Sequence, residues 1–295
     1  MHKNNPNKDG YDMAALVNIL PELKPFILKS KSNRLTIDFS DSKAVKALNR
    51  AILKKDYGVE YWDIPDGYLC PGIPGRADYL YHLADIIEAP EGRSISALDI
   101  GTGANLVYPL VASHAFKWNI VATDVEQHSV NSAKEIVKLN KGLSKKIEVR
   151  HQPDKSFIFK NIIKKDEYFD VSICNPPFHA SEQAATQGSE RKSRNLKQNK
   201  SKRGSNLQAS KNDALNFSGA SNELWCKGGE LVFIKNMVEQ SAVFKEQVGL
   251  FTCLVAKKDH LPAIQMAFKA ANVKGFKIVD MSQGSKISRF VAWWF

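Results

Sequence analysis

Two hydrophobic periods alternate along most of the chain. From residue 94 onward, short apolar runs typical of buried strands are separated by stretches whose apolar residues recur every three or four positions, the spacing of an amphipathic helix. The runs that predict strands are 94–100, 119–125, 146–151, 168–174, 250–256, 275–281 and 288–295. Helical spacing is clearest in residues 128–142 and 261–273. Strands that alternate with helices indicate an α/β fold with a mostly parallel sheet. The short link before the last run favours an antiparallel terminal strand.

The N-terminal part of the chain has a different pattern. It predicts two helices and a short strand, over 12–20, 40–58 and 35–39. The stretch 61–75 is crowded with Pro and Gly, and we expect it to be a loop. An amphipathic helix then begins at Arg76. We therefore divide the chain into a small N-terminal accessory region, 1–73, and a larger domain, 74–295.

A glycine-rich turn follows the first strand of the larger domain. In "LDIGTGAN", Gly101 and Gly103 let the backbone turn sharply and approach a ligand closely. Asp124 lies 23 residues after Gly101, at the end of the next strand, where a carboxylate accepts hydrogen bonds from the ribose hydroxyls of a nucleoside cofactor. The pattern admits NAD or S-adenosylmethionine. It favours S-adenosylmethionine, because Leu106 takes the third glycine position of the dinucleotide motif. The acid Asp99 also suits a sulfonium and an ammonium better than a pyrophosphate.

The sequence "CNPPF", residues 174–178, follows the fourth strand. Because this turn and the glycine turn both lie at carboxyl ends of parallel strands, we expect them to line one crevice. Pro176 and Pro177 donate no amide hydrogen and hold the backbone rigid, which leaves carbonyl acceptors beside the amide oxygen of Asn175. These acceptors can bind both N–H groups of a planar amine, and Phe178 offers a ring face to a flat base. The turn predicts methyl transfer to an amine by positioning and polarisation, without a metal or a nucleophile.

The chain carries a formal net charge of +11, which favours a polyanionic partner such as nucleic acid. Seven Lys and Arg residues and no acid lie between Arg191 and Arg203. The surrounding stretch, 189–213, has almost no apolar residues, and we expect it to be a mobile basic loop on the substrate side of the crevice.

Other classes of protein are disfavoured. No run of 18 apolar residues is present, so we expect no membrane-spanning helix, and the N-terminus lacks the layout of a signal peptide. The four cysteines are scattered and form no C-x-x-C pair, which argues against a zinc site and a disulfide framework and is typical of a protein in the cytoplasm.

The combination of "DIGTGAN" and "NPPF" resembles the amino-methyltransferases of the Rossmann-like, S-adenosylmethionine-dependent class. With "PGIPGRADY", "GGELVFIKNM" and "VAWWF", the chain is similar over nearly its whole length to the bacterial large-subunit ribosomal RNA adenine-N6 methyltransferase F family. That family is related to a eukaryotic enzyme that acts on U6 small nuclear RNA. The resemblance implies an enzyme that methylates an adenine of 23S ribosomal RNA, on free RNA or on an assembly particle of the large subunit. It also implies that the accessory region 1–73 contacts RNA.

The resemblance also implies roles for single residues. Arg76, which opens a helix and is placed to fork a carboxylate, would contact the carboxylate of the cofactor. Gly101 and Asn105 would hold its methionine end. Asp124 would hold the ribose, in a position where relatives carry Glu. Ser156 would lie by the adenine of the cofactor, and Asn175 would orient the target amine.

Alternative interpretations of the same residues remain open at this point. Glutamine-N5 methyltransferases of release factors have a similar turn, usually with Tyr in place of Phe178, and DNA adenine methyltransferases act on the same amine. A non-catalytic protein that binds ribosomal RNA or assists ribosome assembly is a third alternative. Among the aromatic residues, we expect Trp225, Trp293 and Trp294 in the core or at a sheet edge. Tyr61 and Trp62 are candidates for stacking on RNA.

Overall fold

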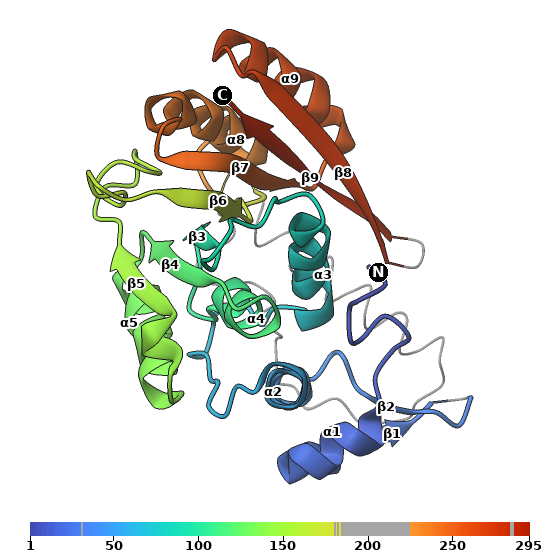
Figure 1. Ribbon diagram of the computed structural model, residues 1–295. Helices are drawn as coiled ribbons and strands as arrows, with labels where there is room; N and C mark the ends of the chain where they lie inside the picture. Colours follow the sequence, from blue (N-terminus) through green and yellow to red (C-terminus); the bar gives the residue numbers. More distant parts are fainter. Residues whose placement is uncertain (31, 180, 182, 184–224, 284–285) are drawn as a thin grey trace.

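The computed structural model describes residues 1–30, 32–179, 181, 183, 225–283 and 286–295 (Figure 1). Within these residues, a seven-stranded sheet has the order β5-β4-β3-β6-β7-β9-β8. Its strands are β3 (Ser96–Ile100), β4 (Asn119–Asp124), β5 (Ile147–His151), β6 (Phe169–Cys174), β7 (Val248–Val255), β8 (Gly275–Gln283) and β9 (Lys286–Trp294). Neighbours from β5 to β7 pair in parallel, whereas β9 is antiparallel to both β7 and β8. The predicted α/β fold, with a mostly parallel sheet and an antiparallel terminal strand, is confirmed.

Helices cover both faces of this sheet. Successive side chains of each strand point to opposite faces, so both faces present apolar residues that helices can bury. Ala97 of β3 belongs to one apolar cluster, while its neighbour Leu98 belongs to the other. The first face is covered by α3 (Ile73–Ala84), α4 (Val107–Ala115) and α5 (Gln127–Leu139). The second face is covered by α8 (Gly229–Ser241) and α9 (Leu261–Ala270). Figure 1 shows α8 and α9 on the side of the sheet opposite α3 and α4.

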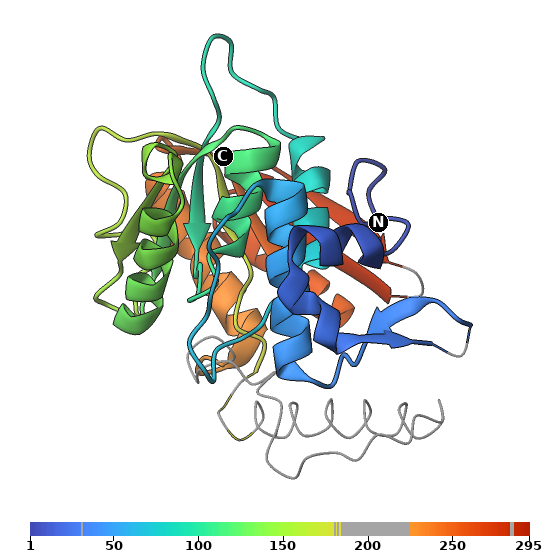
Figure 2. The same cartoon turned by 90° about the horizontal axis from the view of Figure 1, so that it is seen from below.

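The N-terminal elements extend the first face outward. They are α1 (Met13–Ile19), β1 (Ile27–Lys29), β2 (Leu35–Ile37) and α2 (Ser42–Tyr57). Leu48 and Ile52 of α2 are fully buried in the same apolar cluster as the first face of the sheet. Figure 2 shows α1 and the β1–β2 hairpin gathered against α2 on one side of the molecule. The boundary at residue 73 therefore lies within a continuous core, and its assignment as a functional division stays a prediction.

The start of the chain is attached to helix α3. The backbone N–H of His2 donates to a carboxylate oxygen of Asp78 over 2.6 Å, and the side-chain amide of Asn5 donates to the carbonyl of Pro74 over 2.9 Å. Both acceptors lie on the helix that carries Arg76, so the first residues of the chain help to fix a helix that reaches the ligand pocket.

Several boundaries and one whole helix differ from the predicted pattern. Helix α3 begins at Ile73, inside the expected loop 61–75, because Pro74 stands in its first turn, where a helix tolerates proline. Helix α5 ends at Leu139, three residues before the expected end at residue 142, and the side-chain amide of Asn140 donates to the carbonyl of Ile136 there. Helix α8 was not predicted from the apolar pattern.

Two further expectations concern membrane-spanning helices and the basic loop. In the described residues, no helix is both long enough and apolar enough to cross a membrane. The predicted basic loop, 189–213, lies outside the described residues.

Candidate active site

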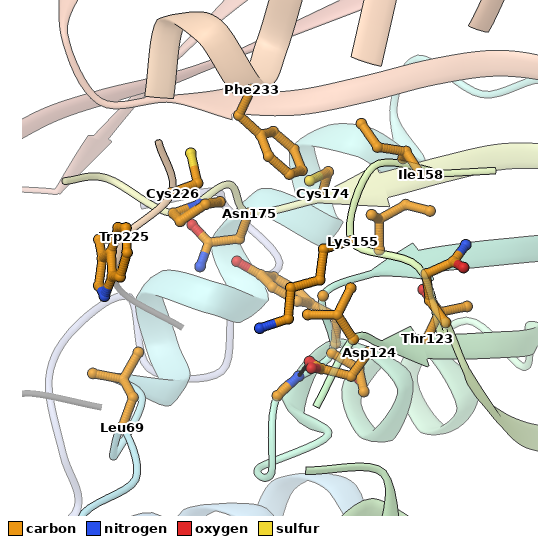
Figure 3. Close-up of a pocket in the computed structure, with 18 of the residues that line it drawn as sticks. Leu69, Thr123, Asp124, Lys155, Ile158, Cys174, Asn175, Trp225, Cys226 and Phe233 are labelled. Atoms are coloured by element: carbon orange, nitrogen blue, oxygen red, sulfur yellow. Dashed lines mark hydrogen bonds between the residues drawn. The ribbon is translucent and has the colours of Figure 1, made fainter. Parts of the chain in front are cut away.

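A cavity of about 510 Å³ opens at the carboxyl ends of β3, β4, β5 and β6 (Figure 3). Each strand contributes the residues at or just after its end: Gly101 after β3, Asp124 at the end of β4, Gln152 after β5 and Asn175 after β6. This arrangement follows from the parallel pairing, which brings the carboxyl ends of these strands to one edge of the sheet. The glycine turn and the "NPPF" turn thus line one crevice, as predicted.

The glycine turn is folded back against the end of β4. Gly101 and Gly103 have φ values of 73° and 64°, in the left-handed region that favours glycine. The N–H of Gly101 and the N–H of Thr102 both donate to the carbonyl of Thr123, over 2.9 and 2.8 Å. A methyl group built on Gly101 would meet no heavy atom within 4 Å, so the turn leaves open space where a ligand can approach the backbone.

Asp124 is held from two sides by the backbone. One carboxylate oxygen accepts from the N–H of Gly103 and the other from the N–H of Glu126, each over 2.9 Å. Burial raises the pKa of Asp124, and the two backbone N–H groups oppose that shift. Each oxygen retains a lone pair, so the carboxylate is fixed in place and can still accept hydrogen bonds from a pair of hydroxyls.

Asp99 lies beneath the same turn and is almost completely buried, with 1% of its surface exposed. Neither of its carboxylate oxygens makes a hydrogen bond of ordinary geometry, and the nearby hydroxyl of Thr102 is also without one. Burial raises the pKa of Asp99 to about 7, the proximity of Thr102 lowers it, and the negative charge of Asp124 raises it. Asp99 is not part of the cavity wall, so it can act on a ligand only through its charge behind the turn.

The residues that follow the glycine turn form a tight helix start. Leu106 has a φ of 53°, which is strained for a branched side chain, and is fully buried. The Asn105 side-chain oxygen accepts from the N–H of Val107 over 3.1 Å, and its backbone carbonyl accepts from the indole N–H of Trp62 over 2.8 Å. Trp62 is only 2% exposed. The expectation that it stacks on RNA is therefore wrong, because its ring is buried against the turn.

Arg76 reaches the cavity from the first turns of α3. Its guanidinium donates to the hydroxyl of Tyr108 over 3.2 Å and lies 5.8 Å from the centre of that ring. Among the described residues, no carboxylate forms an ion pair with it. A half-buried guanidinium in a ligand pocket without a carboxylate partner is suited to bind the carboxylate of a ligand.

The "NPPF" turn contributes two of its four residues to the cavity wall, Asn175 and Pro177. The amide oxygen of Asn175 is buried and makes no hydrogen bond within the described residues. Pro176 and Phe178 are outside the wall. The role expected for the ring of Phe178 therefore stays a prediction, and the aromatic residues that do reach this end of the cavity are Trp225 and Phe233.

The opposite end of the cavity follows strand β5. Ser156 is not in the wall, and its hydroxyl donates to the carboxylate of Asp154 over 2.6 Å. Its neighbours Phe157 and Ile158 do line the cavity, together with Gln152. Phe157 and Ile158 could have been found in the sequence as an apolar pair directly after the predicted Ser156. Trp225, Phe233 and Asn236 had no such signal, since they depend on helix α8.

The cavity fits S-adenosylmethionine by the chemistry of its groups. It offers a carboxylate fixed for hydroxyls, an arginine for a carboxylate, a buried acid behind the turn for a cationic group, and apolar walls for a flat base. The described part of the chain contains no group of three or more His, Cys, Asp and Glu that could hold a metal ion.

Comparisons with known proteins cover the whole length of the chain. A family described as RNA methyltransferase matches residues 1–295. The Ribosomal RNA large subunit methyltransferase F of Colwellia psychrerythraea is 46% identical over 302 residues, covering 100% of the chain and 99% of that protein. The protein of the same name from Christiangramia forsetii is 46% identical over 297 residues, with full coverage of both.

Solved structures give the same result. The catalytic domain of hMettl16 in complex with the MAT2A 3'UTR hairpin 1 has a TM-score of 0.82 and 29% identity, covering 100% of this chain and 95% of its own. The N-terminal domain of human METTL16 in complex with SAH has a TM-score of 0.77 and 26% identity, with 100% and 98% coverage. By its full-length match to the family and to these relatives, the chain belongs to the RNA methyltransferase family.

Proposed function

We propose that this chain transfers the methyl group of S-adenosylmethionine to the N6 amine of one adenine in 23S ribosomal RNA. Its family, and the name of relatives about 46% identical over the full length, support an RNA methyltransferase of the large ribosomal subunit. The observation that carries the choice of an amine is the amide oxygen of Asn175. It is buried and lacks a hydrogen-bond partner among the described residues, and Asn175 lines the cavity.

An unpartnered acceptor at this position matches a substrate that brings its own donor. The amine of adenine is planar, and its nitrogen lone pair is conjugated with the ring. When Asn175 accepts one N–H and a backbone carbonyl of the "NPPF" turn accepts the other, the lone pair is directed toward the cofactor. The cofactor, when bound, supplies an electrophilic methyl group on a sulfonium. The proton lost by the amine after methylation passes to solvent, so no side chain is needed as a base.

The cofactor would lie along the strand ends. We assign its carboxylate to Arg76, its methionine part to Gly101 and Asn105, and its ribose hydroxyls to Asp124. The buried acid Asp99 and the close approach at Gly103 would favour the cationic end. For the adenine of the cofactor we propose the apolar pair Phe157 and Ile158 as walls, since the hydroxyl of the predicted Ser156 already donates to Asp154.

The RNA partner fits the charge of the chain, +11 in total. One structural relative is a catalytic domain in complex with an RNA hairpin. We propose that the N-terminal region, 1–73, contacts the RNA, because it packs beside α3 and two of its own residues, Leu69 and Pro71, line the cavity. The reaction is expected in the cytoplasm, on naked 23S RNA or on an assembly particle of the large subunit.

One labelling experiment tests this function against its rivals. The protein is incubated with radiolabelled S-adenosylmethionine and, separately, with naked 23S RNA, large-subunit assembly particles, double-stranded DNA and a release factor. We expect label in RNA alone, recovered as N6-methyladenosine after digestion. Label in the release factor or in DNA would identify one of the two rival methyltransferases. Cofactor binding by calorimetry without label in any substrate would contradict the proposed reaction on these substrates.

A further inference from the structure

Two residues of the cavity wall each carry a buried polar atom without a partner, and the two atoms are of opposite kind. The amide oxygen of Asn175 is an acceptor, and the indole N–H of Trp225 is a donor. Neither makes a hydrogen bond with any residue that the structure describes. A buried polar group that lacks a hydrogen bond destabilises the free protein, so two of them in one pocket indicate that a ligand completes both.

The backbone fixes these two residues next to each other. His179, four residues after Asn175, forms a parallel β-bridge with Trp225. The N–H of Cys226 donates to the carbonyl of His179 over 3.0 Å, and the N–H of Gly229 donates to the carbonyl of Cys226 over 2.9 Å. Trp225 is therefore tied on one side to the "NPPF" turn and on the other to the start of α8. Figure 3 shows its ring at the end of the cavity where Asn175 lies, away from Asp124.

This donor and acceptor match an exocyclic amine beside a ring acceptor, a pattern that cytosine presents with N4 and N3 and that adenine presents on two edges. Adenine carries a donor, its N6 amine, directly beside a ring acceptor, N7 on one edge and N1 on the other. Guanine presents two acceptors, O6 and N7, on the corresponding edge. A guanine placed with O6 against Asn175 would set two acceptors against each other.

We propose that Trp225 recognises the target base, its indole N–H donating to N1 or N7 of the adenine whose amine is bound by Asn175. This rests on the proposed function and adds a base-recognition residue to it. It also corrects the expectation that Trp225 lies in the core or at a sheet edge, since its ring reaches the cavity. Trp293, in contrast, is fully buried in the core as expected.

The test uses Trp225→Phe, which keeps an aromatic ring and removes the N–H. Three RNA substrates are compared: the fragment that carries the adenine labelled by the wild-type protein, and the same fragment with 1-deazaadenosine or 7-deazaadenosine at that position. In the wild-type protein, kcat/KM should fall about five- to tenfold on one of the two analogues, the effect of one lost hydrogen bond. Trp225→Phe should lose a similar factor on adenine and show no further loss on that analogue.

Phe233→Leu is the matched control, because Phe233 lines the same cavity and has no polar atom. It should retain the penalty of the wild-type protein on the deaza analogue. If Trp225→Phe fails to fold, as judged by lost binding of S-adenosylmethionine, benzothienylalanine at position 225 replaces it, since that side chain keeps the bicyclic ring and exchanges only the N–H for sulfur.

The inference is overturned if neither analogue slows the wild-type protein, or if the variant without the N–H keeps the full penalty. Failure of the proposed function is a different result: the wild-type protein would then transfer no methyl group to adenine in any RNA. A wild-type protein that methylates adenine while its variants show no coupling refutes only the role of Trp225.

Discussion

At the scale of the residue, Asp124 and Asn175 have opposite states of hydrogen bonding. Both oxygens of Asp124 accept from backbone N–H groups, so the carboxylate is oriented before any ligand arrives. The oxygen of Asn175 has no partner in the described structure and is available to a donor on a substrate. We therefore propose that Asp124 serves binding of the cofactor and that Asn175 serves the reacting amine.

This division predicts opposite effects of two substitutions. Asn175→Ala should lower turnover by about 10²-fold or more, as does the loss of an oriented polar group at a reacting centre. Its affinity for S-adenosylmethionine should stay within a few-fold of the wild-type value. Initial rates with labelled cofactor and RNA measure the first quantity, and calorimetry without RNA measures the second.

Asp124→Ala serves as the comparison. It should weaken cofactor binding by about 1.5–3 kcal/mol, the contribution of a charge-assisted hydrogen bond. Near wild-type turnover in Asn175→Ala would refute the role given to the amide. Unchanged cofactor affinity in Asp124→Ala would show that the ribose lies elsewhere.

Asp99 predicts a pH dependence of stability in the protein without cofactor. Its pKa is raised from 3.8 to about 7 by burial, so the folded state holds the proton more tightly than the unfolded chain does. The contribution of this group is fully present below about pH 4 and is lost as the pH rises through 7. Asp99→Asn, which is always neutral, should therefore gain stability relative to the wild type as the pH rises.

The measurement is the difference in the free energy of unfolding between Asp99→Asn and the wild type at about pH 5, 6, 7 and 8. We expect the difference to grow in favour of the variant, by roughly 1–3 kcal/mol in the free energy of unfolding over this range. A difference that is constant with pH would mean that Asp99 is ionised in the folded protein throughout.

At the scale of the element, the start of helix α8 is anchored by one buried acid. Glu230, in the first turn of α8, is 2% exposed. Its carboxylate accepts from the N–H of Ala256 over 2.6 Å and from the N–H of Lys257 over 3.3 Å, and it contacts the imidazole Nδ1 of His260 over 2.7 Å. These bonds tie α8 to the loop after β7 and so hold the residues 225–229 that border the cavity.

We expect Glu230→Ala to lower the free energy of unfolding by about 2–4 kcal/mol, because two backbone N–H groups and an imidazole lose their acceptor in a buried site. Thermal or urea unfolding measures the effect. Glu239→Ala is the control on the same helix, where an exposed acid makes no hydrogen bond or ion pair in the described structure. Its effect should be within about 0.5 kcal/mol. Equal effects of the two substitutions would contradict the anchoring role of Glu230.

The elements also show what the sequence could predict. All seven sheet strands were found, because each has a continuous apolar run or an alternation of apolar and polar residues. The turns after β3 and β6 were found because Gly101, Gly103 and the two prolines are residues that favour a sharp or rigid turn at the end of a strand. Helix α8 was missed, and with it the aromatic wall formed by Phe233, because apolar residues on nearly all its faces give little helical periodicity.

At the scale of the whole molecule, the pocket is built from segments far apart in the sequence. Leu69 lies before the sheet begins, Asp124 and Asn175 end two strands of it, and Phe233 belongs to a helix of the second face. Such an assembly depends on tertiary packing, so the sequence could name the residues of local motifs but not Phe233 or Asn236. The distribution of charge along the chain also concerns the whole molecule, and it can be taken from the sequence without knowledge of the packing.

The stretch from Arg191 to Arg203 carries seven of the basic residues and no acid, and it lies outside the described residues. Each phosphate that a Lys or Arg neutralises releases counterions, so the log–log slope of affinity against salt should be roughly −0.7 per contact on single-stranded RNA. Replacing four of the seven with Gln should flatten this slope and weaken RNA binding. Binding of S-adenosylmethionine and the preference for the target adenine should be unchanged, since phosphate contacts carry no base identity.

A variant with four other lysines changed to Gln gives the matched control for total charge. Exposed lysines that line no part of the cavity are suited to this, namely Lys258, Lys269, Lys274 and Lys277. Both variants lose the same net charge, but only a loss of direct phosphate contacts changes the slope itself, which a filter-binding series from low to high salt measures. If the two variants have equal slopes, the basic stretch acts through the overall charge of the protein and touches no phosphate. If only the variant in 191–203 has the flatter slope, this stretch contacts phosphates of the RNA backbone.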